Sequence, residues 1–246
     1  MGGSIFEEVT ASYSNKSPDI DDITKFKKLF NTIQDLINRG WIQALHDVSD
    51  GGLFTTLAEL AFTNKVGITI LLPDGVDNSQ SIFQNLFSEE AGVVIQLNDD
   101  FENQALALFS KENINARKCA IQTTDAQITV LVNNKIKFHE SVVSLEKIWS
   151  ETSYAIKSLR DNPESAQEEY DLIEKYDDQG LIAKDSFQYS AALPSFNVNS
   201  KPKVAIFREQ GVNGQNEMAA AFMIAGFDAT DLHMQDLLDH PNLLSE

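Results

Sequence analysis

The sequence has very little cysteine and no long apolar run. Cys119 is the only cysteine among 246 residues, which excludes an internal disulfide and a cysteine-based zinc cluster. No apolar stretch reaches the ~18 residues that a membrane-spanning helix needs. These shortages indicate a cytoplasmic protein without a membrane partner. Cys119 itself is expected to pack as a small hydrophobe in a strand around residues 117–121.

Positive charge is also scarce. The chain has 19 Lys and Arg residues against 37 Asp and Glu residues, a formal net charge of −18. This balance argues against a basic nucleic-acid-binding surface, so we expect no nucleic-acid partner. The excess is concentrated in residues 161–185, which hold nine acidic side chains and two lysines. Such a charge run is typical of a solvated linker or an exposed helix.

Apolar residues make up 42% of the chain, which is enough for a globular core. From about residue 22 to 159, helix-period and strand-period segments alternate, which predicts an α/β or α+β domain. Helices are predicted at 23–37, ended by Gly40, and at 53–62, with strands at 41–45, 66–72, 91–97, 127–132 and 135–140. Asn133 and Asn134 predict a two-residue hairpin turn. Ser79, and Asp99 or Asp100, are expected to cap further helices, and Ser144 to open another.

The last part of the chain has the pattern of a βαβ unit. A strand at 204–207, a glycine-bearing turn, a helix at 215–225 and a strand at 227–233 follow one another. About 45 residues with two strands bury too little surface to fold independently, so we expect the chain to stop inside a domain. Residues 161–200 are expected to be an acidic linker that lies against other domains.

Residues 46–52, His-Asp-Val-Ser-Asp-Gly-Gly, gather an imidazole, two carboxylates, a hydroxyl and two glycines between a predicted strand and a predicted helix. Asp47 and Asp50 offer the hard oxygen ligands that magnesium prefers, and Ser49 offers a hydroxyl. The glycines allow backbone N–H groups to approach a phosphate at a helix N-terminus. The alternative is a capped turn, in which Ser49 or Asp50 is the N-cap and the glycines form the bend.

Five segments, in the same order, resemble those of the large phosphoribosylformylglycinamidine synthases of purine biosynthesis. The first is the opening Gly-Gly-Ser, and the second joins the 46–53 motif to the helix that follows it. The segments are residues 1–4, 46–53 with 56–62, 86–95, 149–152 with 159–163, and 204–213 with 217–222. Glu89, in the third segment, matches a position of the family motif, although a buried carboxylate at a helix end explains it nearly as well.

The resemblance implies a domain arrangement. Residues 1–160 would be the C-terminal α/β domain of the second aminoimidazole ribonucleotide synthetase-like half of the core. Residues 161–200 would be the linker, and residues 201–246 the first βαβ unit of a class I glutamine amidotransferase domain. In this family, ATP and magnesium activate formylglycinamide ribonucleotide, and ammonia from glutamine then completes the amidine.

The resemblance also implies roles for individual residues. Asp47 matches a magnesium ligand and Ser49 a nucleotide contact, the nucleotide being ATP or a structural ADP. His46 and Asp50 are expected to orient the turn. The family's cysteine nucleophile has no counterpart, because Cys119 lies in the wrong domain. The fragment is therefore expected to be inactive alone and to need the remaining domains of the same polypeptide.

Two alternatives remain open. The chain could be another ATP-using member of the same superfamily, similar to selenophosphate synthetases or hydrogenase-maturation proteins. That hypothesis predicts no amidotransferase start, and residues 208–213 argue against it. The chain could also be a non-catalytic nucleotide-binding module that ends in a receiver-like domain. This second hypothesis requires a complete second domain.

Overall fold

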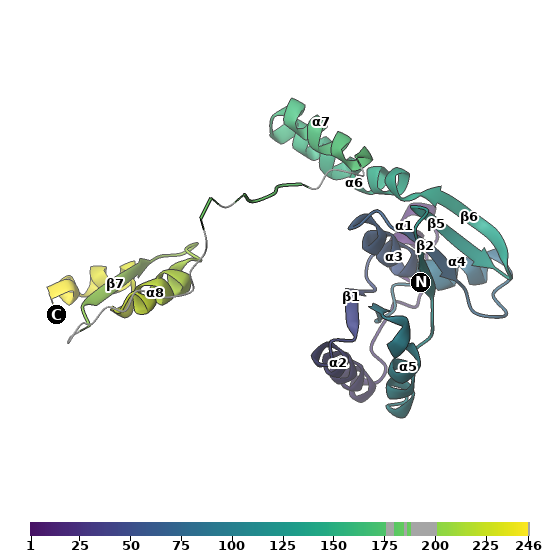
Figure 1. The fold of residues 1–246 in the computed structure, drawn as a ribbon, viewed down its shortest axis with the longest axis horizontal. Coiled ribbons are helices and arrows are strands. Elements are labelled where there is room, and N and C mark those ends of the chain that lie inside the picture. The colour runs from purple at the N-terminus through teal and green to yellow at the C-terminus, as the bar shows by residue number, and fades with distance from the viewer. Residues whose placement is uncertain (176–179, 185, 188–200, 246) are drawn as a thin grey trace. The chain divides into compact units, whose positions relative to one another are not determined.

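A computed structural model describes residues 1–175, 180–184, 186–187 and 201–245. The chain divides into two compact units, Met1–Gln179 and Gly180–Glu246, called unit 1 and unit 2 below (Figure 1). None of the helices in the described residues combines the length and apolar content that crossing a bilayer requires.

Unit 1 alternates helices and strands along most of its length. Its helices are α1 (Ile5–Thr10), α2 (Ile23–Asn38), α3 (Gly52–Phe62), α4 (Ser79–Phe87), α5 (Glu102–Lys111), α6 (Val142–Arg160) and α7 (Pro163–Asp171), with 3₁₀ turns η1 (Asp99–Phe101) and η2 (Leu172–Glu174). Its strands are β1 (Ile42–Asp47), β2 (Gly67–Leu71), β3 (Val93–Leu97), β4 (Ala120–Thr123), β5 (Gln127–Val132) and β6 (Lys135–Ser141).

The strands of unit 1 form two sheets. One has the order β4-β2-β5-β6, in which β2 and β5 are parallel and the other pairs are antiparallel. The other is the antiparallel pair β1-β3. This mixed arrangement confirms the predicted α/β or α+β class. The predicted hairpin is also confirmed, since Asn133 and Asn134 join β5 to β6 with φ of 49° and 60°.

The larger core of unit 1 lies between α3 and the four-stranded sheet. Ile70 and Ile128 are fully buried at the centre of this sheet, and Ala61 of α3 is fully buried in the same cluster. A second, smaller core joins α2 and α5 beside the β1-β3 pair, around the fully buried Leu36. Strand β1 packs on the smaller core and α3 belongs to the larger one. The turn that joins β1 to α3 therefore lies at the junction of the two cores.

Three helix starts differ from the predictions. Asn78, not Ser79, caps α4, because its side chain accepts the N–H of the third helical residue, Ser81. Ser141 caps α6 by accepting the N–H of Ser144 at 3.0 Å, so the helix opens before the predicted residue. Helix α5 has no side-chain cap, because Asp99 and Asp100 belong to the 3₁₀ turn that leads into it.

The acidic segment begins as a helix, one of the two forms that its charge run predicts. Asn162 caps α7, whose first residue is a proline. Helices α6 and α7 lie side by side (Figure 1), with the rings of Tyr154 and Tyr170 stacked at 4.5 Å between centroids. Lys157 adds an ion pair to Glu169 at 2.5 Å. Unit 1 thus extends past residue 160, whereas residues 176–179, 185 and 188–200 of the predicted linker lie outside the described residues.

Unit 2 contains the predicted βαβ unit. Strands β7 (Lys203–Arg208) and β8 (Asp228–His233) are parallel neighbours, joined through α8 (Gln215–Ile224). Helix α9 (Met234–Asp239) and the 3₁₀ turn η3 (Leu243–Ser245) follow. The ring of His233, the last residue of β8, caps α9 by accepting the N–H of Gln235 at 3.0 Å.

Candidate functional site

The 46–52 motif forms the turn that joins β1 to α3. Asp47 is the last residue of β1, and its carboxylate is 75% exposed. Ser49 and Asp50, which follow in the turn, are also exposed. The structure therefore presents both site residues predicted from the sequence, Asp47 and Ser49, to solvent within one short turn.

Two left-handed glycines give the turn its shape. Gly51 has φ +80° and Gly52 has φ +66°. A Cβ on Gly52 would lie 2.8 Å from the carbonyl oxygen of Leu86, so the N-terminus of α3 approaches the end of α4 backbone to backbone. Only glycine satisfies both the φ angle and this contact.

The N-cap of α3 is Gly51, and no side chain caps the helix. The alternative interpretation, with Ser49 or Asp50 as a capping side chain, is therefore wrong. The Gly52 N–H instead bonds to the backbone carbonyl of Ser49 at 2.9 Å. This backbone hydrogen bond positions the start of α3 without using the Ser49 hydroxyl or the Asp50 carboxylate.

The glycine N–H groups have acceptors within the protein. The Gly51 N–H donates to Oε1 of Glu89 at 2.8 Å, and the Gly52 N–H is taken by Ser49. The expectation that these N–H groups face a phosphate is thus not met. The groups that the turn exposes are the Asp47 and Asp50 carboxylates and the Ser49 hydroxyl.

His46 is held on both sides of its ring. Its Nδ1 lies 2.7 Å from the carbonyl oxygen of Asp47, and its Nε2 lies 2.9 Å from Oε2 of Glu59 on α3. The other oxygen of Glu59 accepts the indole N–H of Trp149 on α6 at 2.9 Å. Thr56 donates to the same Asp47 carbonyl at 3.2 Å. These contacts fix the backbone beneath the Asp47 side chain.

Glu59 and Trp149 lie outside the 46–52 motif, within the segments 56–62 and 149–152. Thr56 and Glu59 are three residues apart on α3, so they share the helix face that meets the end of β1. That spacing is the available sequence signal for their role. Trp149 lies 90 residues from Glu59, and no local pattern connects the two.

The turn fits a magnesium ion that is shared with a ligand, and does not fit a closed protein site. Within the described residues, no group of three or more His, Cys, Asp or Glu side chains could hold a metal ion. Magnesium is commonly held by one or two carboxylates together with phosphate oxygens and water. The exposed carboxylate of Asp47 suits that arrangement. Two hollows on unit 1, beside the end of α5 and beside the β5-β6 turn, include no residue of the motif.

Comparison with known families gives two matches. Residues 1–133 match the family described as AIR synthase related protein, C-terminal domain. Residues 201–246 match the family described as CobB/CobQ-like glutamine amidotransferase domain. The first match covers more than half of the chain.

Solved structures of PurL from Thermotoga maritima are also similar. The complex with ATP is 16% identical with a TM-score of 0.44, covering 51% of this chain and 23% of that chain. The complex with FGAR is 17% identical with a TM-score of 0.43, covering 48% and 20%. The PurLQS structure is 16% identical with a TM-score of 0.45, covering 57% and 24%. The chain thus spans less than a quarter of the length of these three structures.

Proposed function

The chain belongs to the family of AIR synthase related proteins, through their C-terminal domain, and on this premise we propose that it serves phosphoribosylformylglycinamidine synthesis. In this reaction, formylglycinamide ribonucleotide becomes formylglycinamidine ribonucleotide at the expense of ATP and glutamine. The order of the two family matches supports the proposal. A synthetase-related domain is followed by an amidotransferase-like segment, the pair that a glutamine-dependent ligase needs.

The 46–52 turn is the part of this chain that we assign to the nucleotide. Asp47 would hold a magnesium ion, and Ser49 would contact the nucleotide, ATP or a structural ADP. The single observation that carries the assignment is the exposure of both side chains on a turn whose backbone is fixed by Glu89, Thr56 and His46. A bound magnesium ion would neutralise part of the phosphate charge there.

Glutamine hydrolysis is not assigned to this chain. Its only cysteine, Cys119, precedes β4 in unit 1, outside the amidotransferase-like residues 201–246. We therefore propose that the nucleophile, and the rest of the substrate site, come from other domains of the same polypeptide. The amidotransferase match also weighs against ATP-using relatives that lack such a domain.

Binding of magnesium and ADP to the 246-residue chain tests this assignment, measured by isothermal titration calorimetry. Asp47→Asn should weaken binding by at least about tenfold, the size of one charge-assisted contact. Ser49→Ala should weaken it by a smaller factor. Asp100→Asn, which removes an exposed carboxylate elsewhere in unit 1, should leave it unchanged. Equal affinities for the wild type and Asp47→Asn, or no binding at all, would contradict the proposal.

A further inference from the structure

The carboxylate of Glu89 lies between two helix N-termini. Its Oε1 accepts the backbone N–H of Gly51 at 2.8 Å and the backbone N–H of Ile5 at 3.0 Å. Gly51 is the N-cap of α3, and Ile5 is the first residue of α1. One oxygen of the half-buried Glu89 therefore joins two segments that are 38 and 84 residues away from it in the sequence.

Both N–H groups belong to the first turns of helices, where backbone donors have no partner within the helix. A side-chain oxygen that accepts such a donor satisfies it, whether the oxygen belongs to a carboxylate or to an amide. At Gly51 this matters more than usual, because α3 has no side-chain cap. Glu89 holds the N–H of the N-cap residue itself, and so fixes the point at which α3 begins.

Aromatic packing brings α1 within reach of Glu89. The ring of Phe6 lies 5.2 Å from that of Phe83 and 5.1 Å from that of Phe87, between centroids. Phe83 and Phe87 belong to α4, which ends just before Glu89. Helix α1 is thus anchored on α4, and the Ile5 N–H is directed at the same carboxylate oxygen that holds Gly51.

We propose that Glu89 is a positioning residue for the nucleotide turn. Resting on the function proposed above, it fixes Gly51 through the backbone and so holds Ser49 and Asp47 in the orientation that nucleotide and magnesium require. The role depends on the acceptor oxygen and not on the negative charge. It also explains why Glu89 and not the adjacent Glu90, whose side chain is exposed, contacts the turn.

Amide hydrogen exchange tests the positioning role without any nucleotide. In the 246-residue chain, the amides of Gly51 and Ile5 should exchange slowly in the wild type and in Glu89→Gln, whose amide oxygen still accepts both N–H groups. Glu89→Ala should exchange at least about tenfold faster at both amides. Glu90→Ala is the matched control, because it removes the same charge one residue away, and it should behave as the wild type. Unchanged exchange in Glu89→Ala would overturn the proposal.

Binding of magnesium and ADP tests the consequence for the site. Glu89→Ala should weaken binding about tenfold, whereas Glu89→Gln and Glu90→Ala should stay within about threefold of the wild type. Equal losses in Glu89→Gln and Glu89→Ala would show that the charge matters and would overturn the acceptor role. Failure of the wild-type chain to bind would contradict the proposed function instead, and the exchange rates would still decide whether Glu89 holds the turn.

Discussion

Nε2 of His46 lies 2.9 Å from Oε2 of Glu59, whose other oxygen accepts the indole N–H of Trp149. The end of β1, the middle of α3 and α6 are therefore joined through one carboxylate. Since Nδ1 of the same imidazole contacts the Asp47 carbonyl, this connection reaches the backbone of the candidate site.

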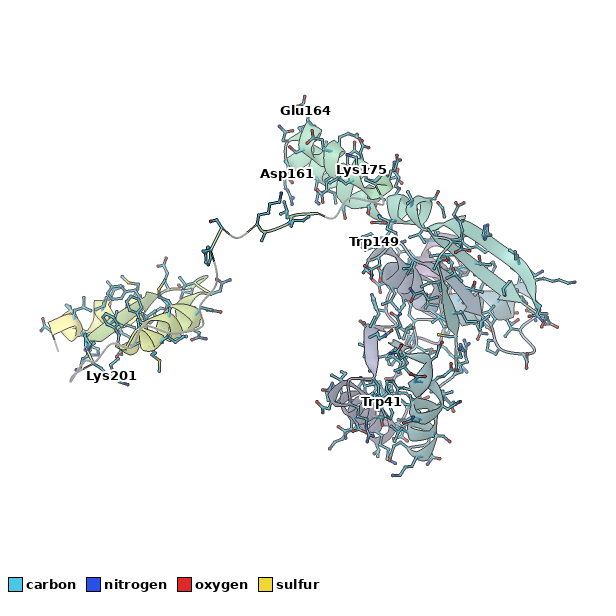
Figure 2. All side chains as sticks on the ribbon, in the orientation of Figure 1. Trp41, Trp149, Asp161, Glu164, Lys175 and Lys201 are labelled. Atoms are coloured by element: carbon cyan, nitrogen blue, oxygen red, sulfur yellow. The ribbon has the colours of Figure 1, made fainter. Side chains whose placement is uncertain are left out.

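Removing the shared acceptor should destabilise unit 1. Glu59→Ala is expected to lower its free energy of unfolding by about 1–2 kcal/mol, because the Trp149 indole N–H loses its acceptor, the His46 ring loses its contact, and water replaces them only in part. Trp41 and Trp149 both lie in unit 1 (Figure 2), so tryptophan fluorescence during urea unfolding reports on this unit alone. Glu151→Ala, on the exposed face of α6, should change stability by less than about 0.5 kcal/mol. Equal effects of the two substitutions would contradict the expectation.

The close approach of α3 to α4 gives a second prediction. Gly52→Ala should cost at least about 3 kcal/mol of unfolding free energy, because the new methyl group meets backbone atoms at 2.8 Å and φ is +66°. Gly40→Ala is a control at nearly the same angle, φ +68°, with no atom within 4 Å of the added Cβ. It should cost only about 1–2 kcal/mol. Urea unfolding measures the free energy of unfolding of both variants. Equal losses in Gly52→Ala and Gly40→Ala would show that the backbone contact is unimportant.

The single cysteine offers a chemical test of burial. Burial raises the pKa of the Cys119 thiol, and the nearby Arg117 lowers it by less. Because the thiolate is the reactive form, iodoacetamide at about pH 8 should alkylate the folded chain about tenfold more slowly than the urea-unfolded chain. Glutathione in the same urea concentration corrects for the effect of urea on the reaction itself. Equal rates would mean that Cys119 is accessible as a thiolate in the folded chain.

Glu7 predicts a dependence of stability on pH. Its burial works to raise the pKa of the carboxyl, but hydrogen bonds from Ser14 and from the Gly3 N–H leave the pKa below its ordinary value of 4.5. A lowered pKa in the folded state stabilises the fold above the ordinary pKa, and this contribution is lost as the pH falls through the folded pKa.

Urea unfolding between about pH 6 and about pH 3 measures this contribution. Unit 1 should lose less stability with falling pH in Glu7→Gln than in the wild type. The exposed neighbour gives the control, and Glu8→Gln should follow the wild-type curve. Superimposable curves for Glu7→Gln and the wild type would contradict the prediction.

Local sequence patterns predict most of the elements but not their connections. The apolar stripe ended by Gly40 predicts α2, and the Asn133–Asn134 turn predicts the hairpin, because both depend on residues close in sequence. Helix starts are less well determined. Asn78 and Ser79 are adjacent residues that can both cap a helix, and only the structure shows which one does.

The candidate site is predictable in part for the same reason. Asp47 and Ser49 lie in one motif and are placed together by the turn itself. The groups that hold the turn, Glu59, Glu89 and Trp149, come from other elements and meet it only in the folded chain. The charges of α7 are visible in the sequence and predict a linker or an exposed helix, whereas the packing of Tyr170 on Tyr154 is not visible there.

Binding of the nucleotide at the Asp47–Ser49 turn is tested most directly by locating the bound metal. Manganese takes the same oxygen ligands as magnesium and broadens nearby NMR resonances. With manganese and ADP, the amide resonances of residues 46–52 should broaden first, and Asp47→Asn should abolish this effect while the spectrum otherwise stays that of the folded chain. Broadening that is centred on the acidic helix α7, or that persists unchanged in Asp47→Asn, would contradict a nucleotide site at this turn.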